Sequence, residues 1–185
     1  MKRRILLLAL PLLAACVKDR TFTPSTGGGG NGSIAITQGL LKVNELVAAG
    51  STNVNEFGTA EDWFEIYNTH TEAITLQAGQ WFVSDGGPSV PMKYELPEVT
   101  IPALGHLVIW CDNLNTVETQ IHTNFALSSA GEHLVIYYKS DTAEFVVDDY
   151  AYGPWSTPGA SLGRSPDGGD NWITFTNPTP GAPNP

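Results

Sequence analysis

The segment SLGRSPDGGDNWITFTNPTPGAPNP, residues 161–185, decides how the fold is interpreted. Prolines and glycines crowd it, which is typical of a disordered tail. Trp172, Ile173 and Phe175 lie in its middle, however, and disordered segments are poor in such side chains. The sequence therefore predicts two strand edges joined by a Pro-Asp-Gly-Gly turn, with Trp172 and Phe175 folded back onto a core. The following NPTPGAPNP is expected to run as extended chain along the domain.

Upstream of this segment, the chain is a series of short runs rich in Val, Ile, Tyr, Phe and Trp. Gly, Pro, Asn, Asp and Ser separate the runs, and several runs alternate apolar and polar residues as strands do. The predicted strands are residues 40–47, 62–68, 72–76, 80–85, 92–97, 105–112, 132–139, 144–152 and 171–175. Many short strands without crossover helices predict an all-β, antiparallel sandwich or barrel.

The N-terminus has the pattern of a secretory signal. A positive patch, residues 2–4, precedes the apolar run of residues 5–13, which is much shorter than the about 20 residues of a membrane-spanning helix. The run ends in LAAC, which resembles the lipobox of bacterial lipoproteins. This resemblance predicts a signal peptide over residues 1–15 and a lipidated Cys16, whose acyl chains would anchor the protein in the outer membrane. An ordinary secretory signal with a coincidental cysteine is the alternative.

A glycine-rich stretch separates this anchor from the rest of the chain. Residues 16–38 are predicted to be a flexible linker, and residues 39–185 one folded domain. Residue types next to Cys16 leave both a periplasmic and a cell-surface orientation open. The linker is expected to let the domain stand away from the membrane.

The chain is acidic, with nine Lys and Arg against 19 Asp and Glu and a formal net charge of −10. Such a surface repels phosphate backbones, so nucleic acid is not an expected partner. Cys111 lies in an apolar run and is predicted to be a packed core thiol.

Five short motifs occur in the order and rough spacing of the lamin-tail domain. They are VNEL (43–46), DWFEIYN (62–68), IHTNFALSSAGEHLVIY (121–137), SLGRSPDG (161–168) and NPTPGAPN (177–184). The chain thus resembles a bacterial lipoprotein member of the lamin-tail family over about residues 39–184. The resemblance implies an immunoglobulin-like β-sandwich and an adhesive or accessory role, because such bacterial domains accompany exported hydrolases and surface proteins.

Metal and nucleophile motifs are missing from the sequence. The histidines have no metal-ligand spacing, and there is no nucleophile elbow or phosphate loop. We therefore expect no enzymatic activity and no cofactor, and we expect His122 to make structural hydrogen bonds. Asp167, Asp170 and Asn171 form a partial calcium-type set, for which a solvated turn is the alternative.

Charged side chains in predicted strands need partners. Asp148 and Asp149 are adjacent on a strand, point to opposite faces and so cannot flank one glycosidic bond. Arg164 is expected to be held by a carboxylate, for example that of Glu65, in an architectural role.

Tryptophans raise the question of carbohydrate binding. Trp63, Trp110 and Trp172 lie in strand patterns and are predicted core residues. Trp155 lies in a loop close to Tyr152, and these two are the candidate ligand-binding residues, with a buried loop anchor as the alternative for Trp155. The sequence predicts a membrane-anchored binding, adhesion or scaffolding module for an unidentified protein or glycan. The alternatives are a glycan-binding accessory module and a small exported hydrolase.

Overall fold

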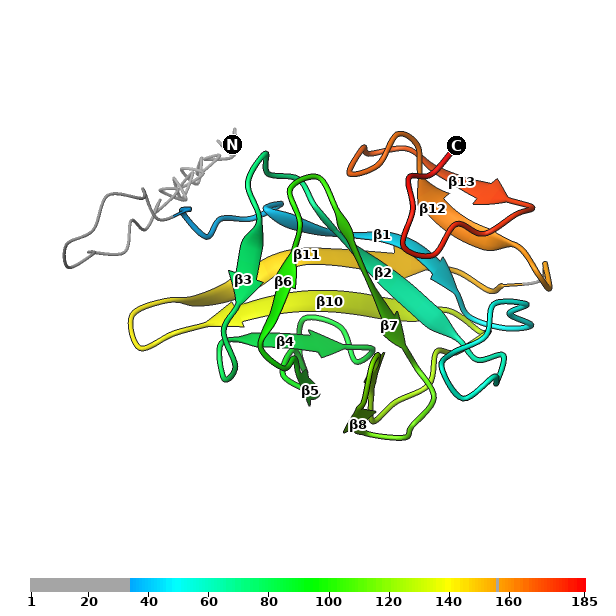
Figure 1. The fold of residues 1–185 in the computed structure, drawn as a ribbon, viewed down its shortest axis with the longest axis horizontal. Coiled ribbons are helices and arrows are strands. Elements are labelled where there is room, and N and C mark those ends of the chain that lie inside the picture. Colours follow the sequence, from blue (N-terminus) through cyan, green and yellow to red (C-terminus); the bar gives the residue numbers. More distant parts are fainter. Residues whose placement is uncertain (1–33, 156) are drawn as a thin grey trace, which may run out of the picture.

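The computed structural model describes residues 34–155 and 157–185, and in that part of the chain every regular element is a β-strand (Figure 1). The predicted signal peptide, Cys16 and most of the predicted linker lie outside the described residues. Within the described ranges, no helix has the length and hydrophobicity needed to span a membrane.

The strands are short and follow one another closely along the chain. They are β1 (Leu41–Val47), β2 (Trp63–Asn68), β3 (Ile74–Leu76), β4 (Trp81–Ser84), β5 (Tyr94–Glu95), β6 (Val99–Ile101), β7 (His106–Trp110), β8 (Thr116–Val117), β9 (Ile121–His122), β10 (Glu132–Lys139), β11 (Glu144–Tyr152), β12 (Ser161–Arg164) and β13 (Trp172–Phe175).

These strands form a β-sandwich. One sheet has the order β13-β12-β1-β2-β7-β9-β8, the other has the order β11-β10-β4-β5, and β3 pairs with β6. Apolar side chains from both main sheets, such as Phe64 and Ile66 on one and Trp81 and Ile136 on the other, share one buried cluster. This confirms the predicted all-β sandwich.

Among the pairs of named strands in the described residues, one departs from the antiparallel expectation. β9 runs parallel to β7, with Ile109 opposite Ile121 and Trp110 opposite His122. After β7 the chain reverses direction into β8 and reverses again into β9, which pairs antiparallel with β8. β9 therefore runs in the same direction as β7. The strands that residue patterns did not predict, β6, β8 and β9, have only two or three residues each, too few to show a period of two. By contrast, β10 and β11 match their predicted ranges at both ends.

The C-terminal segment is folded, as predicted. β12 and β13 form a hairpin, and β12 pairs with β1, so the hairpin extends the seven-stranded sheet. Phe175 is buried, and the half-buried Trp172 packs against the central cluster. Figure 1 shows the red chain after β13 folding back past β12 toward β7.

A second apolar cluster lies apart from the central one. Val47, Trp63 and Trp110 form it together with the partly buried Val108. Because neighbouring strand residues point to opposite faces, Trp63 faces away from the side of β2 that carries Phe64. The prediction that Trp63 and Trp110 are buried is thus confirmed, although they do not belong to the central core.

Candidate functional site

A β-bulge in β1 places polar side chains on the outer face of the seven-stranded sheet. Val43 pairs with Ile66, but the next pair is Glu45 with Glu65, so Asn44 is the extra residue. Two glutamates therefore lie directly opposite each other, the arrangement in which cross-strand side chains interact most strongly. Asn44, Glu45 and Glu65 are all fully buried.

The C-terminal segment covers Glu45. The backbone N of Thr179 donates to both carboxylate oxygens at 3.1 and 3.2 Å, and Thr179 Oγ1 donates to Oε2 at 3.1 Å. Ser161 Oγ donates a further hydrogen bond to Oε1. Burial raises the pKa of Glu45 above its ordinary value, and these hydrogen bonds partly offset the effect.

Glu65 is closed off in the same way. Gly181 N donates to Oε2 at 2.6 Å, and Asn44 Nδ2 donates to Oε1 at 3.1 Å. Burial raises the pKa of Glu65 to about 8, and the negative charges of Glu45 and Asp167 push it in the same direction. Glu65 is therefore mostly protonated at neutral pH, which relieves the repulsion between the two opposed carboxylates.

Asp167 belongs to this buried network. Its Oδ1 accepts hydrogen bonds from Asn44 Nδ2 at 2.9 Å and from Asn184 N at 3.1 Å, and its Oδ2 lies 3.3 Å from His106 Nε2. Asp170, by contrast, has a side chain that is 99% exposed and lies 3.5 Å from Lys42 Nζ. The structure thus gives the two carboxylates of the suggested calcium set different surroundings. Over the described ranges, no group of three or more His, Cys, Asp or Glu side chains is placed to hold a metal ion.

Gly163 makes the close approach of the C-terminal segment possible. It lies opposite Glu45 in the β1–β12 pair. A Cβ at this position would lie 2.8 Å from the Phe175 ring, 2.9 Å from Asn184 Nδ2 and 3.1 Å from Glu45 Cγ. The glycine therefore lets the hairpin, the buried carboxylate and the C-terminal segment meet.

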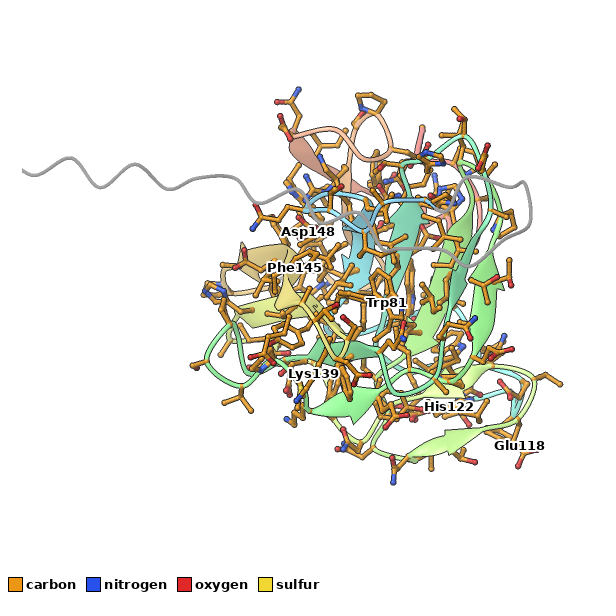
Figure 2. All side chains as sticks on the ribbon, turned by 90° about the vertical axis from the view of Figure 1, so that its left-hand side faces the viewer. Trp81, Glu118, His122, Lys139, Phe145 and Asp148 are labelled. Atoms are coloured by element: carbon orange, nitrogen blue, oxygen red, sulfur yellow. The ribbon has the colours of Figure 1, made fainter. Side chains whose placement is uncertain are left out.

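Arg164 is held by a carboxylate, as predicted, but the partner is Asp148. Its Nη2 lies 3.3 Å from Asp148 Oδ2, and its Nε donates to the carbonyl oxygen of Val43 at 2.7 Å (Figure 2 labels Asp148). The suggestion of Glu65 was wrong, because the C-terminal segment and Asn44 already occupy the Glu65 carboxylate. The Arg164 guanidinium also lies over the Trp172 ring, 4.8 Å from its centroid.

Asp148 and Asp149 point in different directions, as the strand geometry predicts. Asp148 turns toward Arg164, whereas Asp149 Oδ2 lies 3.4 Å from His133 Nδ1. The two adjacent carboxylates do not share a site.

His122 is a second buried polar centre. Its Nδ1 lies 2.6 Å from Asp112 Oδ2, and its Nε2 lies 3.1 Å from Glu56 Oε2. Burial alone lowers the pKa of His122, but the two carboxylates outweigh burial and raise it. Hydrogen bonds from His122 and Gln120 likewise lower the pKa of Glu56, against the effect of burial. Both ring nitrogens are engaged, so His122 ties the chain after β1 to β9.

Tyr152 is not an exposed platform. It is only 5% exposed, and its hydroxyl lies 3.0 Å from the carbonyl oxygen of Ser128 and 3.1 Å from Glu132 Oε1. Trp155 is half-buried and packs against the central cluster, and its backbone N donates to Ser129 O. Tyr152 was predicted as a candidate ligand-binding residue, but the structure buries its ring in the central core.

Neighbouring aromatic rings also serve the fold. Tyr150 stacks on Trp172 with ring centroids 3.5 Å apart and planes 10° from parallel. The stack covers one face of each ring.

The arrangement as a whole secures the C-terminal segment to the sheet. The residue patterns did not predict the roles of Asn44, Asp148, Thr179 and Asn184. A β-bulge cannot be recognised from the alternation of apolar and polar residues. Hydrogen-bond partners that are far apart in the chain have no characteristic spacing in the sequence. The sequence did carry one signal for this arrangement: the VNEL and NPTPGAPN motifs quoted above, which the fold brings into contact.

No family model matches this chain, and a search of curated proteins finds no match either.

Proposed function

We propose that this chain is a lipid-anchored, non-catalytic binding or scaffolding module of the bacterial outer membrane, with a lamin-tail-like β-sandwich at the end of a linker. The LAAC sequence ending at Cys16, the glycine-rich residues that follow and the five motifs support this proposal. The all-β fold is compatible with the immunoglobulin-like architecture that the motifs imply.

The observation that carries the proposal is the closure of the Glu45–Glu65 pair. A glycosidase needs two carboxyl groups on either side of an accessible bond. Here both carboxyl groups are fully buried and accept hydrogen bonds from the backbone of Thr179 and Gly181. The opposed Glu45 and Glu65 side chains thus hold the chain together, which favours an architectural role over hydrolysis for this pair.

The surface charge supports the choice of partner class. Each Lys and Arg of the described residues lies within ion-pair distance of a carboxylate: Lys42–Asp170, Lys93–Asp85, Lys139–Glu144 and Arg164–Asp148. The remaining charge is acidic, which favours protein partners with basic surfaces over nucleic acid. The glycan-binding alternative is weakened by the burial of Tyr152.

Anchoring is tested by labelling cells with radioactive palmitate and comparing the native chain with Cys16→Ala. We expect label and detergent-dependent extraction for the native chain only. Equal labelling, or membrane release of both chains by salt, would contradict lipidation of Cys16.

Protease treatment of intact cells then decides the orientation. Cleavage of the domain on whole cells places it on the cell surface. Protection until the outer membrane is broken places it in the periplasm, and partners are then sought there.

A further inference from the structure

The buried ring of His122 lies between two carboxylates. Its Nδ1 lies 2.6 Å from Asp112 Oδ2, its Nε2 lies 3.1 Å from Glu56 Oε2, and its side chain is 0% exposed. An ionised carboxylate only accepts hydrogen bonds, so a ring that bonds one on each side must carry a proton on both nitrogens. This geometry is therefore that of a doubly protonated, positively charged imidazole.

Both carboxylates already accept hydrogen bonds from other donors. Glu56 Oε1 accepts from Thr119 N at 3.1 Å and from Gln120 N at 3.0 Å. Asp112 Oδ1 accepts from Leu114 N at 3.2 Å. Such bonds favour the ionised form of a carboxyl group. The protons shared with the ring therefore belong to the ring.

The turn of residues 55–59, between β1 and β2, is attached to the sheet through this same centre. The Glu56 carboxylate bonds β9 through the His122 ring, and Glu56 N donates to Gln120 Oε1 at 3.0 Å. The Phe57 ring lies 5.2 Å from the His122 ring. The charge on one buried ring thus bears directly on how the turn is held.

The segments that contact the ring supply no other cation. Residues 48–62 and 111–123 contain no Lys or Arg. Their titratable side chains besides the three already named are Glu61, Asp62, Cys111 and Glu118. Figure 2 shows Glu118 farther out than His122. Tyr94 on β5 and Cys111 stay neutral near pH 7, because burial raises the pKa of each above its ordinary value and the charge of Asp112 adds to the effect.

We propose that His122 fastens the turn of residues 55–59 to the sheet only while both of its ring nitrogens carry a proton, and that loss of one proton releases the turn. The sandwich then carries a pH-sensitive element at the end where β1 and β7 finish. This inference goes beyond the proposed role as a binding module. It depends neither on that role nor on lipidation of Cys16.

The two carboxylates respond differently to loss of a proton. Asp112 makes the shorter contact and its side chain is 2% exposed, whereas the Glu56 side chain is 16% exposed and belongs to the turn. Nδ1 therefore keeps its proton and Nε2 loses it. The Nε2 lone pair then faces Glu56 Oε2, and this repulsion is relieved when the turn carries Glu56 out into water.

The direction of the response follows from proton linkage. Burial lowers the pKa of His122, but Asp112 and Glu56 outweigh burial and raise it above the ordinary 6.5. The stabilisation is therefore fully present below about pH 6.5 and is lost as the pH rises through the raised value. Against the effect of burial, hydrogen bonds from His122 and Gln120 hold the pKa of Glu56 below its ordinary 4.5, so Glu56 stays ionised throughout this range.

The test is hydrogen exchange of the full chain from about pH 6 to about pH 9, in phosphatidylcholine nanodiscs if the chain carries lipid. Rates for residues 55–59 and 118–121 are divided by the intrinsic rate at each pH. His122→Gln removes the titrating ring. His133→Gln is the matched control, because His133 is an exposed histidine of β10 beside a carboxylate, that of Asp149.

Corrected exchange of both segments should rise with pH in the native chain and in His133→Gln. The rise is at most about tenfold per pH unit, because one proton is lost. In His122→Gln both segments should exchange faster than in the native chain at pH 6 and without this rise. The proposal is overturned if His122→Gln keeps the pH dependence of the native chain, or if His133→Gln loses it.

Nitrogen NMR of the histidine rings in the unaltered chain keeps the test decisive if His122→Gln does not fold. His122 should show two protonated nitrogens at pH 6, and the amide signals of Phe57 and Gln120 should titrate with the same midpoint as the ring. Glu56→Gln should lower that midpoint by about 1–3 pH units. A neutral His122 ring at pH 6, amide signals that do not follow the ring, or a ring that keeps both protons until the domain unfolds would each overturn the proposal.

Discussion

Arg164 and Asp148 together complete the backbone hydrogen bonding of Val43. The Asp148 carboxylate accepts from Val43 N at 2.9 Å, and Arg164 Nε donates to Val43 O at 2.7 Å. Arg164 Nη2 lies 3.3 Å from Asp148 Oδ2, and the two side chains are only 7% and 15% exposed, respectively. A side-chain ion pair thus takes the place of a strand beside Val43 and joins β1 of one sheet to β11 of the other.

Arg164→Ala should destabilise the domain strongly. It leaves the buried Asp148 carboxylate without its cation and Val43 O without its donor, which costs about 3–5 kcal/mol of unfolding free energy. Urea denaturation measures the change. Asp149→Ala, next along β11 but half exposed, is the matched control and should stay within about 0.5 kcal/mol of the native chain. Equal effects of the two substitutions would show that the ion pair is not structural.

Gly163→Ala should also destabilise the domain, because the added Cβ would collide with atoms of Phe175, Asn184 and Glu45. Overpacking of this kind costs about 1–3 kcal/mol. Gly153→Ala is the matched control, since a Cβ at Gly153 has no atom within 4 Å. Thermal unfolding of both variants measures the difference, and an unshifted midpoint for Gly163→Ala would contradict the predicted contact.

Thr179→Val removes the hydroxyl that donates to Glu45 while keeping the shape of the side chain. Removing one donor from this buried carboxyl group should cost about 1–3 kcal/mol. Thr174→Val, at an exposed position of β13, should have little effect. Limited proteolysis gives a second measurement, because loosening of the C-terminal segment should speed cleavage near residues 177–185 in Thr179→Val only.

The stability of the domain should fall as pH rises above about 5. Glu65 has an ordinary pKa of 4.5, and burial raises it to about 8 in the folded state. Between these values the folded protein binds more protons than the unfolded chain, so the unfolding free energy decreases with pH, by at most about 1.4 kcal/mol per pH unit for this one group. Glu65→Gln cannot ionise and should flatten this slope, which urea titrations at a series of pH values measure. The pKa assignment fails if both proteins show the same slope.

Thiol titration separates Cys111 from Cys16. Cys111 is 1% exposed, and burial raises the pKa of its thiol well above the ordinary value, so the folded chain should not react there with a polar disulfide reagent. After denaturation, a chain lipidated at Cys16 should expose one reactive thiol, and an unlipidated full chain should expose two. Reaction of Cys111 at the same rate before and after unfolding would contradict its placement in the core.

Much of the architecture followed from the residues alone. The β10 and β11 ranges and the folding of the C-terminal segment depended on local signals: β-branched and aromatic residues, alternation and turn residues. Burial of Trp63 and Trp110 followed from the same patterns. The short strand β8 carried too little of this pattern to be predicted.

The sequence by itself determined the all-β class, the strand-rich core and the closing hairpin, because those features depend on residues near one another in the chain. Only the tertiary structure decided the bulge at Asn44, the opposition of Glu45 and Glu65, and the pairing of Arg164 with Asp148. These contacts join residues far apart in the chain, and the hydrogen-bond partner of a buried charge is chosen by the packing of strands rather than by spacing along the sequence.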